Sequence, residues 1–254
     1  MTRKDNLLKF RPGNAKLDKS IYTFSLPSGY TCPGAKDCLA RADIESGKII
    51  DGPHQKYRCF SATDETRPSV RRARWHNFHM LTSCLGSADM AALIQRSLPE
   101  QAQTVRIHVG GDFFSQAYFD AWLSVAERNP DTVFYAYTKS LHFLRDRKER
   151  VARAENFRIT TSEGGKFDHL IEELDLGQHG MGQAKVVFHP DEAEAQGLEI
   201  DHDDSHAINN VDSFALLIHG TQPKDTDAST ALKRLKAEKV KHSYPDQRRK
   251  KNAD

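Results

Sequence analysis

The feature that most constrains the fold is an alternation of short apolar runs and amphipathic segments that begins at Val105. Strand-like apolar runs cover 105–109, 133–137, 157–161, 185–189 and 214–218, and helix-like patterns lie between them. Parallel neighbouring strands need a crossover connection, usually a helix, so this alternation predicts a mostly parallel sheet. We therefore expect an α/β fold. A partial or distorted β/α barrel with about six mostly parallel strands is favoured, and a doubly wound open sheet is the alternative.

Residues 1 to about 65 differ in character, being rich in glycine, proline and charged residues. One strand-like run at 21–26 is followed by a long loop-like stretch. Loops of this length inside a compact domain are usually functional or disordered, and the three cysteines in this one favour a functional loop. A chain of 254 residues fits a single α/β domain. We expect that domain at 1–232, with a cysteine-bearing region at 14–85 and the β/α units at 105–222.

The composition is typical of a globular protein, because 38% of the residues are apolar and 28% are charged. The longest apolar runs fall far short of the roughly 20 residues that a membrane span needs. The N-terminal Met-Thr-Arg-Lys-Asp-Asn is followed by no apolar stretch of the secretory type. We therefore expect a cytoplasmic protein without a membrane partner, in a compartment where thiols stay reduced and structural disulfides are rare.

The four cysteines, Cys32, Cys38, Cys59 and Cys84, are predicted to surround one metal centre. Their spacing is C-x5-C-x20-C-x24-C, and thiolates suit zinc or an iron–sulfur cluster. Zinc sites usually contain cysteines paired roughly two to four residues apart, so this spread spacing favours a [4Fe–4S] cluster over zinc. The competing interpretation is that free cysteines are small buried residues. It fits Cys84 best, because that cysteine continues an apolar helical stripe from Val70.

Polar side chains follow several of the predicted strands. In parallel α/β folds the ligand site lies at the carboxyl ends of the strands, so these side chains predict a shared polar cavity. The residues concerned are His108, Asp112, Thr138, Lys139, 160–163, His189 and His219.

The tripeptide Gly110-Gly111-Asp112 is the most specific of these strand-end features. Two glycines allow a ligand to approach the backbone closely, and the carboxylate suits an amine or a hydroxyl. The alternative is an ordinary tight turn between a strand and a helix. We expect Gly110 and Gly111 to bind a cofactor and Asp112 to orient a substrate or cosubstrate. Lys139 and His108 are then expected to bind its anionic or polar part.

The segment 201–206 contains three aspartates and two histidines. Carboxylate and imidazole groups suit a second metal ion, although a solvated loop is the more common reason for such a run.

A rival hypothesis is a nucleic-acid-binding accessory protein with a purely structural zinc or iron–sulfur centre. Residues 233–254 form a basic tail with nine Lys or Arg against three acids, which suits a polyanion unless it is only a solubilising end. A second basic cluster lies beside the possible stacking platform Trp75. Its members are Arg67, Arg71, Arg72 and Arg74.

Several motifs together resemble the gene product 88 family of bacteriophage and prophage-associated proteins. The resemblance covers roughly residues 14–222 and implies a phage or mobile-element setting, which places the protein in the host cytoplasm; it implies no particular activity. The motifs are FSLPSGYTCPGA (24–35), DGPH (51–54), RCF (58–60), RWHNF (74–78), HVGGDFF (108–114), FYAYTK (134–139) and IDHDDSH (200–206).

The chain is more distantly similar to radical S-adenosylmethionine enzymes. Those combine a partial β/α barrel, a cysteine-held [4Fe–4S] cluster near the first strand and a Gly-Gly-Glu-like turn that binds the methionine amine. This sequence departs from them in lacking the closely spaced Cys-x3-Cys-x2-Cys. The resemblance implies a divergent radical-type enzyme with S-adenosylmethionine as a possible cosubstrate, and a structural or electron-transfer cluster is equally open.

Overall fold

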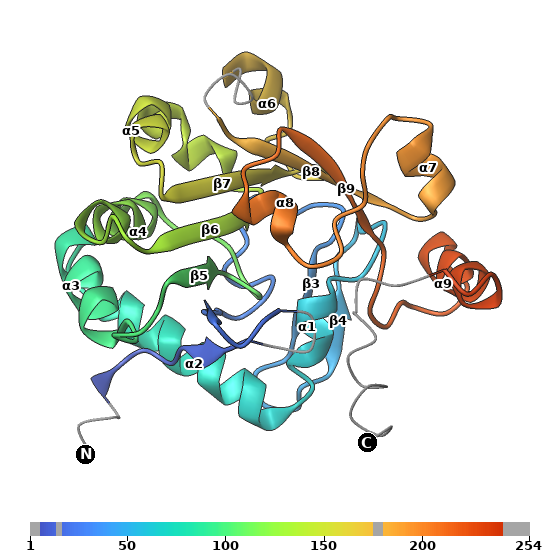
Figure 1. The fold of residues 1–254 in the computed structure, drawn as a ribbon. Coiled ribbons are helices and arrows are strands. Elements are labelled where there is room, and N and C mark those ends of the chain that lie inside the picture. The colour runs from blue at the N-terminus through green and yellow to red at the C-terminus, as the bar shows by residue number, and fades with distance from the viewer. Residues whose placement is uncertain (1–5, 14–16, 175–179, 241–254) are drawn as a thin grey trace, which may run out of the picture.

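The computed structural model describes residues 6–13, 17–174 and 180–240, which form one large sheet and one small hairpin (Figure 1). The large sheet has seven strands in the order β1-β2-β5-β6-β7-β8-β9. The hairpin pairs β3 (Ala40–Ala42) with β4 (Ile49–Asp51). The strands of the large sheet are β1 (Arg11–Pro12), β2 (Ile21–Thr23), β5 (Thr104–Ile107), β6 (Val133–Thr138), β7 (Phe157–Ser162), β8 (Gly182–Val187) and β9 (Ser213–Leu217).

The large sheet is mostly parallel, as the alternating pattern predicts. Only β1 runs antiparallel to its neighbour, and every other pair from β2 to β9 is parallel. The predicted mixed α/β fold is therefore confirmed. In the described part of the chain the sheet is open, with β1 and β9 as its two edges. The strands therefore do not show a closed barrel.

Helices connect the strands and cover the outer side of the curved sheet (Figure 1). Helix α4 shows why one of them begins where it does, because the Ser115 hydroxyl accepts the Tyr118 N–H at 3.2 Å as an N-cap. Within the described residues, no helix is long and apolar enough to cross a membrane. The helices are α1 (Phe60–Asp64), α2 (Pro68–Thr82), α3 (Ser87–Ser97), α4 (Gln116–Arg128), α5 (Lys148–Arg153), α6 (His169–Leu174), α7 (Pro190–Glu194), α8 (Ser205–Ile208) and α9 (Asp227–Ala237), with 3₁₀ turns η2 (Leu141–Phe143) and η3 (Arg145–Arg147).

The main hydrophobic core lies between the outer helices and the sheet. Side chains of a strand alternate between its faces, so Val105 and Ile107 enter this core while Arg106 points to the opposite, inner face. Likewise, Phe134 of β6 joins the outer core, and Tyr135 packs with α8 on the inner face. The inner face is therefore partly polar, and it is the surface on which the site is built.

The segment 201–206 closes over this inner face instead of forming a second metal site. Arg106 forms a buried ion pair with Asp204, and the Tyr135 hydroxyl donates to the same carboxylate at 3.0 Å. The Tyr137 hydroxyl donates to buried Asp201 at 3.3 Å. These aspartates are thus engaged by an arginine and two tyrosines, which accounts for them without a metal ion.

Candidate functional site

Three of the four cysteines line one cavity at the carboxyl ends of β5 and β6. The cavity has a volume of about 180 Å³, and Cys32, Cys38 and Cys59 contribute to its wall. The strand-end residues that the sequence singles out lie in the same wall. They are His108, Gly110, Gly111, Asp112, Thr138 and Lys139.

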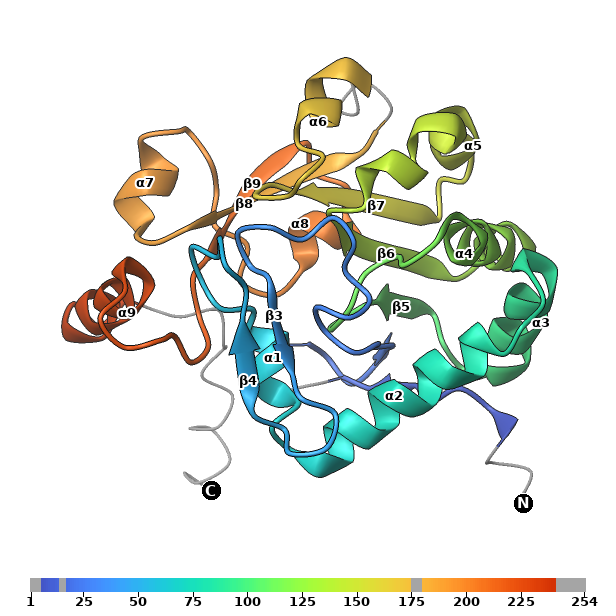
Figure 2. The same ribbon diagram turned by 180° about the vertical axis from the view of Figure 1, so that it is seen from behind.

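The cysteines reach this cavity because the N-terminal loops fold across the strand ends (Figure 2). The amide of Lys166 donates to the Gly34 carbonyl at 2.8 Å, and the amide of Asp37 donates to the Gly164 carbonyl at 2.9 Å. These two bonds fix the loop that carries Cys32 and Cys38 to the segment after β7. Cys59 enters from another direction, as the residue directly before α1.

Burial raises the pKa of all three thiols. The pKa of Cys32 lies well above its usual value because of burial and the nearby Asp112 carboxylate. Burial raises the pKa of Cys38 to about 12, against a smaller opposing effect of Lys139. Burial also raises the pKa of Cys59, which backbone amides and Arg74 partly offset. The metal-free thiols are therefore protonated at neutral pH, and a bound cation would be needed to hold them as thiolates.

Cys84 lies elsewhere, in the turn between α2 and α3. Its thiol donates to the Met80 carbonyl at 3.5 Å, and its side chain packs against the main core. Its position agrees with the interpretation of Cys84 as a small residue on an apolar helical stripe. The four-cysteine arrangement that the sequence predicts is therefore a three-cysteine arrangement in the structure.

Asp112 is buried, and hydrogen bonds occupy both of its carboxyl oxygens. Thr138 Oγ1 donates to one oxygen at 2.6 Å, and the Lys139 amide donates to the other at 2.9 Å. The Phe113 amide also donates to the first oxygen, at 2.7 Å. The carboxylate thus joins the end of β5 to the end of β6 and supports the cavity wall; the predicted contact of Asp112 with a substrate stays a prediction.

The two glycines before Asp112 are needed for packing within the chain itself. A β-carbon at Gly110 would lie 2.2 Å from Ser61 Oγ and 2.6 Å from Arg74 Cζ. Gly111 has φ +86°, and a β-carbon there would lie 2.6 Å from Thr31 Oγ1. Both glycines line the cavity, and the close approach that requires them is made by α1 and α2 at Gly110 and by the loop after β2 at Gly111.

Lys139 and His108 are both buried in the cavity wall and already bonded. The Lys139 ammonium donates to the Ser162 carbonyl and hydroxyl oxygens at 2.9 Å each, and to the Glu163 carbonyl. His108 Nε2 lies 3.0 Å from the Tyr118 hydroxyl, and burial lowers the His108 pKa to about 3. Lys139 is thus less available to an anion than the sequence predicts, and His108 is a neutral imidazole at pH 7.

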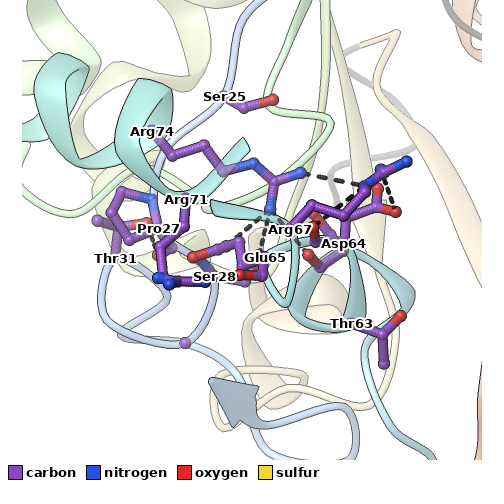
Figure 3. Close-up of polar contacts among 12 residues, drawn as sticks. Ser25, Pro27, Ser28, Thr31, Thr63, Asp64, Glu65, Arg67, Arg71 and Arg74 are labelled. Carbon is purple, nitrogen blue, oxygen red and sulfur yellow. Dashed lines mark hydrogen bonds and ion pairs between the residues drawn. The ribbon is translucent and has the colours of Figure 1, made fainter. Parts of the chain in front are cut away.

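A buried ion pair joins the loops that carry Cys32 and Cys59 (Figure 3). Arg74 of α2 donates to Glu65 Oε1 at 2.7 Å and to the Ser61 carbonyl at 2.8 Å. Ser28, four residues before Cys32, donates its amide to the same Glu65 oxygen at 2.7 Å. This pair could not be predicted from the sequence, because nothing local marks Glu65 as the buried partner of an arginine nine residues later.

Only half of the arginine cluster at the start of α2 is exposed, because Arg67 and Arg72 lie at the surface and the other two members do not. Arg71 and Arg74 are buried, and the Arg71 guanidinium donates to the carbonyls of Glu65 and Ile44 at 2.6 and 2.9 Å. Trp75 packs against Tyr30, Phe78 and His79. Most of the basic tail, residues 241–254, lies outside the described residues.

Across residues 6–13, 17–174 and 180–240, no group of three or more His, Cys, Asp or Glu side chains is arranged to hold a metal ion. This applies to the segment 201–206 as well as to the cysteines. The three thiols line one cavity but do not form such a group in the described residues.

Comparison with known proteins identifies phage relatives. The family described as "Gene product 88" matches residues 2–241. The Gene 88 protein of Mycobacterium phage L5 is 29% identical over 128 residues, which cover 46% of this chain and 47% of that protein. The Gene 88 protein of Mycobacterium phage D29 is 30% identical over 127 residues, with the same two coverages. The alignments thus span about half the length of the curated relatives.

No solved structure matches the chain. The matches support the resemblance to the phage family and give no support to the similarity with radical S-adenosylmethionine enzymes. Because the family match covers nearly the whole chain, this protein belongs to the gene product 88 family.

Proposed function

We propose that this phage-type protein binds an iron–sulfur cluster through Cys32, Cys38 and Cys59. The observation that carries the proposal is the convergence of these three thiols on one cavity. Cys32 and Cys38 come from the connection between β2 and β3, and Cys59 comes from the residue directly before α1. Chance burial of small residues does not explain why three of four cysteines share one wall beside polar strand ends, whereas the fourth packs in an apolar core.

The donor set and the space fit a cluster better than a single zinc ion. Thiolates are the usual ligands of iron–sulfur clusters. The cavity has a volume of about 180 Å³, which is more than one ion needs. Support for a cluster comes from the donor set and the shared cavity wall, because the described residues contain no preformed group of three or more His, Cys, Asp or Glu ligands. Cys32, Cys38 and Cys59 would hold three irons of a [4Fe–4S] cluster and would leave the fourth for another ligand.

The surrounding residues suit this role by fixing and partly neutralising the thiolates. Lys139 and Arg74 lower the pKa of Cys38 and Cys59 respectively, against the larger effect of burial. Arg74 also links the loop before Cys32 to the helix after Cys59. When bound, a cluster of this type supplies one-electron chemistry. The chain's own residues hold the thiol-bearing loops in place and supply positive charge beside the thiols.

Metal analysis of the full chain, purified without oxygen, tests the proposal. We expect iron and acid-labile sulfide in equal amounts and an electron paramagnetic resonance signal on reduction. A colourless protein with one zinc ion per chain contradicts the cluster and favours a structural metal. A protein that takes up neither iron nor zinc after anaerobic reconstitution contradicts any metal centre.

The sequence similarity to radical enzymes adds a separate proposal, that the fourth iron accepts S-adenosylmethionine. Asp112, His108 and Lys139 lie in the wall that such a cosubstrate would meet. Binding to cluster-loaded protein, followed by the spectrum of the reduced cluster, checks this step. If reduced, loaded protein neither binds nor cleaves S-adenosylmethionine, the radical-type reaction fails while the cluster itself stands.

A further inference from the structure

A second, larger cavity adjoins the cysteine cavity on the inner face of the sheet. Its volume is about 420 Å³, within the range of small-molecule sites. The two cavities share wall residues, among them Phe60, Arg106, Val109 and Tyr137. A ligand in the larger cavity would therefore lie against the residues that separate it from the thiols.

Five cationic side chains line the larger cavity, and three of them are already paired. Arg67 pairs with Asp64 at 2.8 Å, Arg74 pairs with Glu65 at 2.7 Å, and Arg106 pairs with Asp204. The remaining two are Lys9 and Arg11, and neither has a carboxylate partner in the described part of the chain. The wall also includes the Asp201 carboxyl, which the Tyr137 hydroxyl and the His206 ring contact. Lys9 and Arg11 are thus the two cations of this wall that have no carboxylate partner among the described residues.

The backbone that carries these two charges is held in place. Asn77, a buried residue of α2, accepts the Lys9 N–H at 2.7 Å and donates to the Lys9 carbonyl at 3.1 Å. The Thr23 hydroxyl donates to the Arg11 carbonyl at 3.1 Å. Lys9 and Arg11 are two residues apart in an extended segment, so their side chains share one face. The pair is therefore presented toward the cavity from a fixed edge strand.

We propose that Lys9 and Arg11 bind a dianionic small molecule in the larger cavity. Two unpaired cations match a group of two negative charges, and a guanidinium binds a phosphate or carboxylate through parallel hydrogen bonds. Lys139 lines the cysteine cavity and not the larger one, and its ammonium already has three oxygen partners. The anion site itself does not require a metal; its role as the substrate site of the cluster rests on the proposed function.

Isothermal titration calorimetry with the metal-free full chain, at low ionic strength, tests the site. Inorganic phosphate and malonate serve as the probes. The probe that binds with the higher affinity identifies the ligand class as a phosphate or a dicarboxylate. The variant Lys9→Gln/Arg11→Gln removes both charges. Its matched control is Lys233→Gln/Lys236→Gln, which removes two exposed charges of α9 outside the cavity wall.

We expect the dissociation constant of the preferred probe to rise about tenfold or more in the cavity variant, because charged hydrogen bonds are lost. The α9 control is expected to stay within about twofold of the unchanged protein, because screening weakens distant charges. Equal weakening in both variants, or no binding of either probe to the unchanged chain, overturns the proposal. If the double variant misfolds, the single variants Lys9→Gln and Arg11→Gln replace it, and each is expected to raise the dissociation constant of the preferred probe.

The outcome is independent of the cluster proposal. A colourless protein that still binds the probe through Lys9 and Arg11 contradicts the cluster alone. A cluster-loaded protein that binds neither probe contradicts the anion site alone.

Discussion

The loops that carry Cys32, Cys38 and Cys59 differ from the turn that carries Cys84 in what surrounds the thiol. The three loop cysteines lie beside buried charges and hydrogen-bonded strand ends. Cys84 lies against an apolar core at the end of α2. A thiol in an apolar setting stabilises the fold by packing. Thiols fixed among charged and polar groups are candidates for metal binding or reaction. The comparison therefore separates a candidate site from a packing position in the same chain.

The two regions also differ in how they are held together. The cysteine loops depend on long-range polar contacts, chiefly the pair between Arg74 and Glu65. The turn between α2 and α3 depends on local helix contacts. In this turn Leu85 is exposed to solvent, and a β-carbon added to Gly86 would have no neighbour within 4 Å. Variants in the first region should thus cost much more stability than matched variants in the second.

The largest effect is expected from Arg74→Met. This change leaves Glu65, which is fully buried, without its ion partner, and breaking a buried pair costs about 3–5 kcal/mol. Urea denaturation of the metal-free chain measures the loss in free energy of unfolding. Arg67→Met is the control, because its pair with Asp64 is largely exposed and contributes at most about 1 kcal/mol. Similar losses in both variants would contradict the role given to Arg74.

A steric test uses one glycine from each region. In Gly110→Ala the new β-carbon would lie 2.2 Å from Ser61 Oγ, so we expect a loss of about 1–3 kcal/mol by overpacking. In Gly86→Ala the new β-carbon has nothing within 4 Å and the backbone is extended, so stability should be unchanged or slightly higher. Thermal and urea unfolding of the two variants measure the change. A Gly110→Ala variant as stable as the parent would show that Ser61 and Arg74 move to make room for the new β-carbon.

His108 makes the cysteine region sensitive to acid. Its pKa is about 3 in the folded chain against 6.5 as the reference value, so the unfolded chain binds the extra proton between these values. Stability from the neutral imidazole is present above pH 6.5 and is lost as the pH falls toward 3, with about 1–2 kcal/mol lost by pH 5. His108→Asn, which tolerates the positive φ of +68°, should show a smaller loss between pH 7 and pH 5 in urea titrations. The same slope in both proteins would show that His108 does not titrate in this window.

The smallest effect is expected from Cys84→Ser. A serine hydroxyl can donate to the Met80 carbonyl as the thiol does, and the site is only partly buried. The free energy of unfolding should change by less than about 1 kcal/mol. A larger loss, seen in the same denaturation assay, would mean that Cys84 does more than fill space.

Periodicity in the sequence predicts the β/α part of the fold and fails in the N-terminal region. The predicted strands at 105–109 and 157–161 match β5 and β7 closely. The hairpin of β3 and β4 lies in what the sequence presents as loop, because strands of three residues show no alternation. The predicted strand at 185–189 begins instead at Gly182, since the pairing with β7 and β9 extends it backward over Gly182, Gln183 and Ala184, which show no apolar run.

The sequence also indicates which residues gather at the strand ends, but not how they are bonded. Asp112 and Lys139 do lie in one wall with the cysteines. Their partners, Thr138 and Ser162, come from neighbouring strands that only the fold brings together. Arg71 and Arg74 look like a basic surface in the sequence, and it is the long-range contacts with Ile44 and Glu65 that make them buried.

The most direct test of the central claim is the iron and sulfide content of four single variants purified without oxygen. These are Cys32→Ser, Cys38→Ser, Cys59→Ser and Cys84→Ser. The three-cysteine site predicts that the first three lose most of the bound iron and sulfide, whereas Cys84→Ser retains the content of the unchanged chain. Equal iron in all four variants, or a loss in Cys84→Ser as large as in the others, would contradict it.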